Sequence, residues 1–177
     1  METHVYLAQK PLKASYESTP ALATVTDHAR TRSAALHDPF RTCVEPMDGC
    51  GVMVPIGTHA ALGGPHDAPT PGDMLCAALA ACQDSAFRMV ANLLRIEITQ
   101  LEVRVTATAD VRGSMAMDPA VPVGFQTMSC DVVFSVKAGT PPALIKKLKV
   151  AAERCCVVQQ TLRAPPMVET TLVDSGA

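Results

Sequence analysis

The segment PTPGDMLCAALAACQDSAFRMVANLL, from Pro69 to Leu94, decides the fold because it predicts one long helix. Thr70 can cap its amino end, Pro71 suits the first helical position, and Asp73 favours the positive end of the helix dipole. Apolar side chains recur at steps of three and four residues, the period of a helix face: Leu75, Leu79, Cys82, Ala86, Met89 and Leu93. The alanines between them allow close approach of another element, so we expect a central helix from about Pro71 to Leu94.

A second helix is predicted from PPALIKKLKVAAERCCVVQQTL, Pro141 to Leu162, which carries a cysteine doublet. Its apolar stripe has the same period: Leu144, Leu148, Ala151, Cys155, Val158 and Leu162. This pattern places Cys155 in the core and Cys156 on the shoulder of the stripe, where a reactive thiol would be accessible and close to Arg154. Packing is the alternative role for both, since a buried cysteine usually acts as a small hydrophobe.

Two strands are predicted between these helices. Apolar and polar residues alternate over 101–109, which is typical of a half-buried antiparallel strand. Residues 111–114 then turn the chain, and Phe125–Lys137 returns with one apolar face: Met128, Cys130, Val132, Phe134 and Val136. A short last strand is expected from Met167 to Val173.

Residues 1–70 predict strands and loops without a core of their own. The alternation over Leu22–His28 is weak, and glycines and prolines punctuate the residues that follow. We therefore expect a single domain over residues 1–177, in which 1–70 supply strands and loops and 71–177 form a helix, hairpin, helix and strand core. The fold class is α+β, with an antiparallel sheet packed against two helices.

Composition excludes several classes of function. The chain has 177 residues, enough for one core, and a formal net charge of −2 with no basic run, which gives no indication of a nucleic-acid partner. No apolar stretch predicts a membrane span and the amino terminus lacks the apolar segment of a signal peptide, so we expect a cytoplasmic protein. Seven cysteines without framework spacing then predict free or catalytic thiols rather than structural disulfides.

The remaining cysteines and histidines form no recognisable metal motif. Several fall in or near one glycine-rich stretch: His37, Cys43, Cys50, His59 and His66. Their spacing matches no metal-binding pattern, so we expect no metal and no other cofactor. Cys76 lies off the stripe of the first helix and Cys130 faces the core with its strand, so we expect both thiols to be inert.

Two cysteine-containing segments, in order along the chain, carry a family resemblance. Gly63–Pro65 and Pro69–Cys82 form the first, and Ala152–Leu162 forms the second. They resemble the first- and second-cysteine regions of the OsmC/Ohr family, the osmotically induced and organic-hydroperoxide-resistance thiol peroxidases. Between them, Asp110–Ser114 and Pro122–Phe125 are similar to one OsmC-like subgroup. The resemblance covers about residues 57–163.

The resemblance implies a fold and an assembly. Members form an intertwined homodimer in which antiparallel sheets wrap two central helices and the active sites lie between subunits. The strands within residues 1–70 would then pair across the dimer, which explains why they have no core of their own.

The resemblance also implies a mechanism. Cys82 matches the peroxidatic thiolate, which attacks a hydroperoxide and becomes a sulfenic acid. Cys156 matches the resolving cysteine, because the family's second cysteine directly precedes Val-Val or Pro-Val, and it would close a disulfide with Cys82. An external thiol or dithiol would then restore both thiols. An apolar, methionine-rich pocket would favour organic hydroperoxides.

The activating groups are less clear from the sequence. Family members usually supply an arginine from the N-terminal strands and a glutamate at the start of the first-cysteine helix. Here Gly72 stands at the glutamate position, and Asp73 is the nearest carboxylate. The arginine has three candidates: Arg30, Arg32 and Arg41. The alternative function is a non-enzymatic OsmC-like protein that binds a small apolar ligand or senses redox state.

Overall fold

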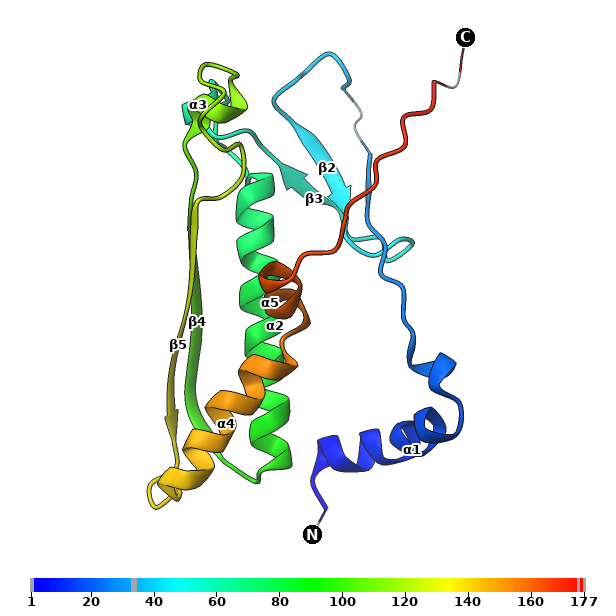
Figure 1. The fold of residues 1–177 in the computed structure, drawn as a ribbon, viewed down its shortest axis with the longest axis vertical. Coiled ribbons are helices and arrows are strands. Elements are labelled where there is room, and N and C mark those ends of the chain that lie inside the picture. Colours follow the sequence, from blue (N-terminus) through cyan, green and yellow to red (C-terminus); the bar gives the residue numbers. More distant parts are fainter. Residues whose placement is uncertain (1, 33–34, 175, 177) are drawn as a thin grey trace.

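The computed structural model describes residues 2–32, 35–174 and 176. Its centre is a long helix, α2 (Pro71–Leu93), followed by a hairpin of two long strands, β4 (Ile98–Thr108) and β5 (Thr127–Val136). Figure 1 shows the hairpin running alongside α2, and the later helices α4 (Pro142–Cys155) and α5 (Val157–Arg163) both pack against α2. This is the mixed α+β architecture expected from the sequence.

Helix α2 begins where the sequence predicts. Thr70 and Asp73 form a capping box: the Thr70 hydroxyl accepts from the Asp73 backbone N–H at 3.2 Å, and the Asp73 carboxylate accepts from the Thr70 backbone N–H at 2.8 Å. The buried face differs from the predicted stripe, since Leu75, Met89 and Leu93 are exposed. The residues that α2 buries are Leu79, Gln83, Ala86, Phe87, Val90 and Ala91.

The predicted hairpin is confirmed with small changes in its ends. Strands β4 and β5 pair antiparallel, with Val105 opposite Cys130 and Leu101 opposite Phe134. Their half-buried side chains alternate with exposed ones, as a sheet with one covered face requires. The predicted turn at 111–114 is a short helix, α3 (Val111–Ser114).

The second predicted helix is broken, and this changes the setting of the cysteine doublet. Cys156 has φ −78° and ψ 101°, an extended conformation that ends α4 and begins α5. The prediction of one continuous helix to Leu162 is therefore wrong. The predicted orientation of the doublet is also wrong, because the break turns the Cys156 side chain inward to 0 % exposure and leaves Cys155 exposed.

The amino-terminal segment contains a helix that the sequence prediction missed. Helix α1 (His4–Ser18) is capped by Thr3, whose hydroxyl accepts from the Tyr6 backbone N–H, and it buries no residue. It contacts α2, where the Val5 backbone N–H donates to the Asn92 side chain at 2.9 Å. The expectation of strands and loops alone in this segment was wrong: the Thr3 cap starts a helix that continues through Pro11.

A small antiparallel sheet follows in the order β1 (Arg30–Thr31), β2 (Thr42–Glu45) and β3 (Val54–Ile56). Short 3₁₀ turns at Pro20–Ala23 and Ala60–Leu62 flank it. No strand forms over Leu22–His28 or Met167–Val173, so both predictions are wrong. Both segments are exposed, and an extended segment without a neighbouring strand has no partner for its backbone hydrogen bonds.

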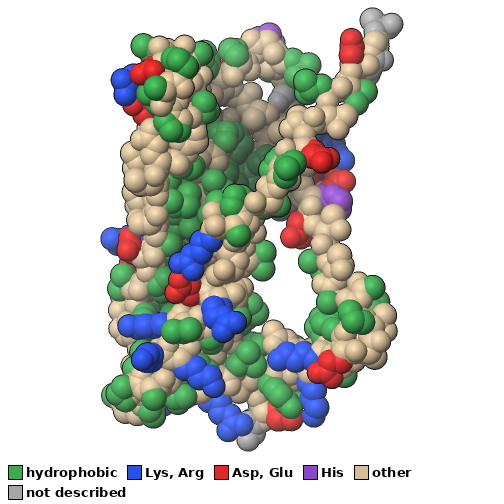
Figure 2. Space-filling model, in the orientation of Figure 1, with side chains coloured by type: hydrophobic (Ala, Val, Ile, Leu, Met, Phe, Trp, Pro, Cys, Tyr) green, Lys and Arg blue, Asp and Glu red, His purple; other side chains and the backbone are tan. Residues whose placement is uncertain are grey.

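The core lies between α2, the hairpin and α4–α5. One buried cluster centres on Phe87, Leu148 and Ala152, and a second on Leu79, Ala86 and Cys156. Figure 2 shows hydrophobic side chains gathered in the hollow between the hairpin and α4–α5. By length and composition α2 could cross a membrane, but core helices pass the same test, and α2 packs against β4, α4 and α5.

Candidate functional site

The structure brings the two predicted redox cysteines together. Cys82 projects from the middle of α2 and Cys156 from the break between α4 and α5, and the Cys82 side chain packs against the buried cluster that contains Cys156. The surrounding side chains are mostly apolar and come from four elements, α2, β4, β5 and α5: Leu79, Ala86, Val105, Met128, Cys130 and Val158. Two thiols of this kind in contact can exchange between a reduced pair and a disulfide.

The environment of Cys156 disfavours its thiolate. Burial raises the pKa of the Cys156 thiol to about 11, and the hydrogen bond and charge interaction with Cys82 raise it as well. A hydrogen bond from the Gln159 backbone N–H lowers the pKa of Cys156, and the charge interaction with Cys130 raises it further. Cys156 is therefore protonated at neutral pH, whereas Cys82 is half-buried on the facing helix.

Contacts across the helix break hold Cys156 in place. The Gln160 side chain donates to the Glu153 backbone carbonyl at 2.9 Å, and Arg163 pairs with the Glu153 carboxylate. These contacts join the last turn of α4 to α5 around the extended residue. They fix the direction in which Cys156 points.

Asp73 lies in the first turn of α2, away from Cys82 in the middle of the helix. Nine residues separate them on the helix, which is roughly 13 Å along its axis. Hydrogen bonds from the backbone N–H and then the hydroxyl of Thr70 lower the pKa of Asp73. Its carboxylate is thus occupied in the helix cap.

The three candidate arginines belong to the amino-terminal segment and are bound by its carboxylates. Arg30 donates from Nε to Glu45 at 2.8 Å, and Arg32 lies 3.6 Å from the same carboxylate. Glu45 is buried, and its pKa is lowered first by the Arg30 hydrogen bond, against the effect of burial, and also by the Gly51 backbone N–H. Arg30 also pairs with Asp48.

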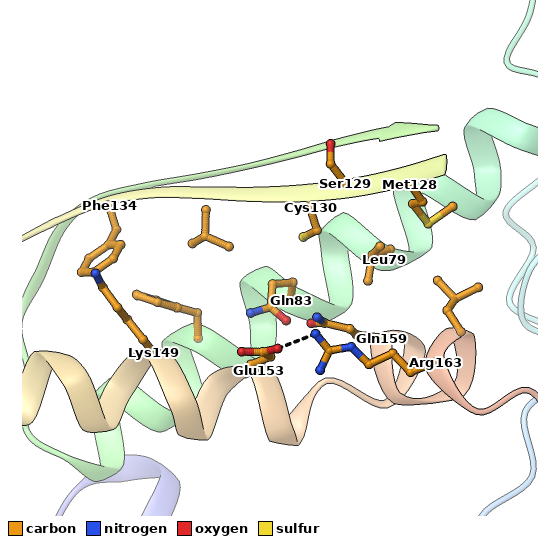
Figure 3. A pocket seen from close by; sticks show the side chains of 13 residues that line it. Leu79, Gln83, Met128, Ser129, Cys130, Phe134, Lys149, Glu153, Gln159 and Arg163 are labelled. Carbon is orange, nitrogen blue, oxygen red and sulfur yellow. Dashed lines mark hydrogen bonds and ion pairs between the residues drawn. The ribbon is translucent and has the colours of Figure 1, made fainter. Parts of the chain in front are cut away.

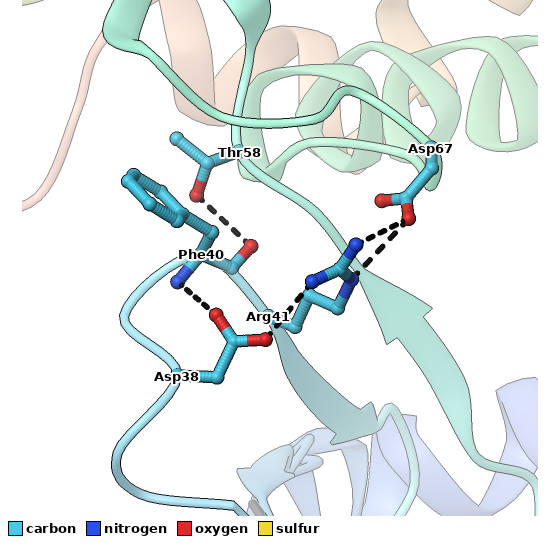
Figure 4. A network of polar contacts seen from close by, with 5 residues as sticks. All are labelled: Asp38, Phe40, Arg41, Thr58 and Asp67. Atoms are coloured by element: carbon cyan, nitrogen blue, oxygen red, sulfur yellow. Dashed lines mark hydrogen bonds and ion pairs between the residues drawn. The ribbon is translucent and has the colours of Figure 1, made fainter.

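Arg41 has a separate set of partners. Figure 4 shows its guanidinium between Asp38, at 3.0 Å, and Asp67, at 2.7 Å. The Asp38 carboxylate in turn accepts from the Phe40 backbone N–H at 2.9 Å. The contacts described for Arg41 thus serve to tie loops of the amino-terminal segment together.

At Gly72 the Phe125 ring lies where a side chain would begin. A Cβ at this position would lie 2.9 Å from Cζ of Phe125, so the Phe125 ring fills the space next to the first turn of α2. Both residues line a broad, largely apolar cavity between the start of α2, the end of β4 and α3. The sequence analysis missed this pairing, which only the folded chain reveals.

A second cavity of about 650 Å³ opens beside the thiol cluster, between α2, β5, α4 and α5. Figure 3 shows Met128 and Cys130 pointing from β5 towards α2, with Leu79 and Gln83 entering the same space. Gln83 is 5 % exposed, and its Oε1 has no hydrogen-bond partner among the described residues. The sequence analysis missed Gln83 because it scored only apolar residues, although Gln83 lies at four-residue steps between Leu79 and Phe87.

The histidines form no metal centre in the part of the chain that the structure describes, where no group of three or more His, Cys, Asp or Glu side chains is placed to hold a metal ion. His59 and His66 lie with ring centroids 4.3 Å apart. His59 accepts a hydrogen bond from the Ala61 backbone N–H, which fixes the ring in the turn.

Comparison with known proteins places the chain among related folds. A family model described as OsmC-like protein matches residues 64–171. None of the curated protein sequences matches the chain.

Solved structures show the same fold at low sequence identity. An OsmC-like protein from Mycoplasma pneumoniae has a TM-score of 0.62 at 14 % identity, covering 80 % of this chain and 89 % of its own. An organic hydroperoxide resistance protein from Elizabethkingia anophelis has 0.57 at 17 %, covering 80 % and 91 %. An organic hydroperoxide resistance protein, OsmC, from Legionella pneumophila has 0.56 at 21 %, covering 79 % and 90 %.

Proposed function

The chain belongs to the OsmC-like protein family, and from this premise we propose that it is a thiol peroxidase that reduces organic hydroperoxides through Cys82 and Cys156. The contact in one apolar cluster between Cys82 of α2 and Cys156 of the α4–α5 break is the observation that carries the proposal. A redox couple needs both sulfurs at one place, and this fold supplies them.

The first step is attack of the Cys82 thiolate on the terminal oxygen of a hydroperoxide. The S–O bond forms, the O–O bond breaks, and the alkoxide leaves as an alcohol after taking a proton. Cys82 is oxidised to the sulfenic acid, and the peroxide is reduced. The apolar surroundings of Cys82 favour an alkyl or aryl hydroperoxide over hydrogen peroxide.

Cys156 then resolves the sulfenic acid. Its sulfur bonds to Sγ of Cys82, the S–O bond breaks, and the departing hydroxide takes the Cys156 proton and leaves as water. The raised pKa of Cys156 suits this role, because the thiol keeps its proton until the sulfenic acid supplies the acceptor. An external thiol or dithiol then reduces the disulfide by exchange.

The active unit in this proposal is a cytoplasmic homodimer. Helix α1 and the extended amino- and carboxy-terminal segments leave large apolar side chains exposed, including Val25, Leu36, Met167 and Leu172. Pairing of the amino-terminal strands with a second copy would cover these side chains. It would also allow Arg30, Arg32 or Arg41 to approach the Cys82 thiolate of the other subunit and stabilise its charge.

A second candidate function is a non-enzymatic OsmC-like protein that binds a small apolar ligand or senses redox state. The specific observation in its favour is the engagement of the candidate activating groups: Asp73 caps α2, and the three arginines pair with carboxylates. Alkylation of Cys82 by iodoacetamide as a function of pH separates the two functions. A Cys82 pKa near that of free cysteine, about 8.5, favours the non-enzymatic function.

A peroxide-consumption assay tests the proposal. Cumene hydroperoxide and dithiothreitol are supplied to the wild type and to Cys82→Ser, with Cys43→Ser as a matched control outside the thiol cluster. The proposal predicts consumption by the wild type and the control, and loss of consumption in Cys82→Ser. Equal consumption by Cys82→Ser would contradict the mechanism.

A further inference from the structure

We propose that Cys130 is a third redox thiol, which takes over the disulfide from Cys82 and presents it to a small thiol reductant in the cavity between β5 and α4–α5. This inference rests on the proposed function. It assigns a task to a residue that the sequence analysis expected to be inert.

The position of Cys130 supports this role. It lies on the inward face of β5, directly opposite Val105 of β4, and both side chains pack against the cluster that contains Leu79, Ala86 and Cys156. Cys130 and Cys156 are close enough to interact electrostatically. The cluster therefore holds three thiols, with Cys156 in contact with Cys82 and near Cys130.

The three thiols differ in how accessible they are to a reductant. Cys156 is 0 % exposed, so a reductant cannot reach its sulfur from solvent. Cys130 lines the cavity of about 650 Å³, whereas Cys82 is not among the described residues that line it. The peroxide and the reductant can then meet the protein on different sides of the same cluster, and Cys130 connects the two sides.

The cavity has the character of a binding site for a small polar-headed molecule. Oε1 of the buried Gln83, which has no hydrogen-bond partner among the described residues, faces it and can accept a hydrogen bond from a thiol or hydroxyl. Lys149, Glu153 and Arg163 form its charged rim. A cavity with one unsatisfied acceptor next to a thiol suits a low-molecular-weight thiol better than an apolar ligand.

The exchange is balanced without any further oxidant. The Cys130 sulfur attacks Sγ of Cys156 in the Cys82–Cys156 disulfide, the Cys130–Cys156 bond forms, and the Cys82–Cys156 bond breaks. The Cys130 proton passes to the departing Cys82 sulfur. Cys82 is then ready for another peroxide, while the reductant thiol attacks Cys130 in the cavity.

Disulfide mapping in a Cys155→Ser background tests the proposal. Trypsin cleaves after Arg154 and Arg163, so the peptide 155–163 then contains Cys156 as its one cysteine. The protein is oxidised with one equivalent of tert-butyl hydroperoxide or, in parallel, with diamide, and free thiols are blocked in acid. We expect a cross-link between the Cys130 and Cys156 peptides, and reduction by dithiothreitol slowed by about tenfold when Cys130→Ser is added.

Two controls complete the experiment. Cys43→Ser, another strand cysteine outside the cluster, should leave both the cross-link and the reduction rate unchanged. If peroxide links no cysteine to Cys156 but diamide links Cys130 to it, the proposed function fails and the exchange step stands. If neither oxidant gives a Cys130–Cys156 link and Cys130→Ser is reduced at the parent rate, the exchange step is overturned.

Discussion

The amino-terminal segment, residues 2–69, and the core that follows it are held together by different forces. Within the described residues, all the buried apolar side chains of the core except Ile56 come after residue 69. The amino-terminal segment instead relies on ion pairs around the buried Glu45 and on one small sheet. The core can therefore assemble the thiol cluster from its own contacts, while the arginines depend on a segment that packs loosely within one chain.

The largest expected effect concerns the packing of the core. Phe87→Ala removes a side chain that is 2 % exposed. The centroid of its ring lies 4.7 Å from that of the Phe134 ring. We expect the free energy of unfolding to fall by about 3–5 kcal/mol, because the lost contacts leave a cavity. Urea denaturation measures this loss. Leu7→Ala in α1 is the control for the other region, and an equal loss there would break the comparison.

Thiol alkylation sharpens the comparison at the level of chemistry. With a pKa of about 11, Cys156 has roughly 300-fold less thiolate near pH 7 than a thiol of ordinary pKa about 8.5. We expect iodoacetamide to modify the partly exposed Cys50 of the amino-terminal segment and the exposed Cys155 long before Cys156. Peptide mass spectrometry over time gives the rates. Modification of Cys156 at the rate of Cys50 would show that the core around it is open.

The cap at the start of the core is a smaller contribution. Thr70→Ala removes the hydroxyl that accepts from the Asp73 backbone N–H. We expect a loss of about 1 kcal/mol in the free energy of unfolding, the usual effect of losing a helix cap. Thr70→Ser keeps the hydroxyl and should restore most of it. No difference between the alanine and serine variants would contradict the assigned cap.

The smallest effects belong to the ion pairs of the amino-terminal segment, and they depend on pH. Arg30 lowers the pKa of Glu45, so the carboxylate stabilises the fold above its unfolded pKa of about 4.3 and this stabilisation is lost as pH falls through the folded value. We expect Glu45→Gln to unfold at a lower temperature than the wild type at pH 7, with the difference shrinking towards pH 3.

Arg41→Gln is the matched control for that experiment. Its ion pairs are exposed, and exposed pairs contribute little to stability, so its melting temperature should stay at the wild-type value at both pH values. If Glu45→Gln has the melting temperature of the wild type at pH 7, the ion pairs of Glu45 do not stabilise this region.

The same contrast explains what the sequence could predict. Helix α2 and the β4–β5 hairpin follow from local patterns, because their apolar faces are covered by neighbours in the same chain. Helix α1 buries no residue and contains Pro11, which disfavours a helix interior, so local pattern did not identify it. The expected strand at Met167–Val173 pairs with no strand among the described residues, and its sequence alone could not form one.

The candidate site was predictable only in part. Local motifs identified Cys82 and Cys156, but the assumption of a continuous helix gave the doublet the wrong orientation. No proline or glycine marks the break at Cys156, and the contacts of Glu153 with Gln160 and Arg163 emerge only after folding. Gly72 likewise depends on the distant Phe125 ring, which no local pattern connects to it.

The most direct test of the central claim, that Cys82 and Cys156 form a redox couple, is a count of thiols after a single turnover. One equivalent of tert-butyl hydroperoxide is added to the fully reduced protein, which is then denatured and titrated for free thiols. The account predicts a fall from the seven thiols of the reduced chain to five, no such fall in Cys82→Ser, and, in tandem mass spectra of the wild type, a cross-link from Cys156 to Cys82 or, after exchange, to Cys130. Seven thiols retained with the hydroperoxide unconsumed would contradict it.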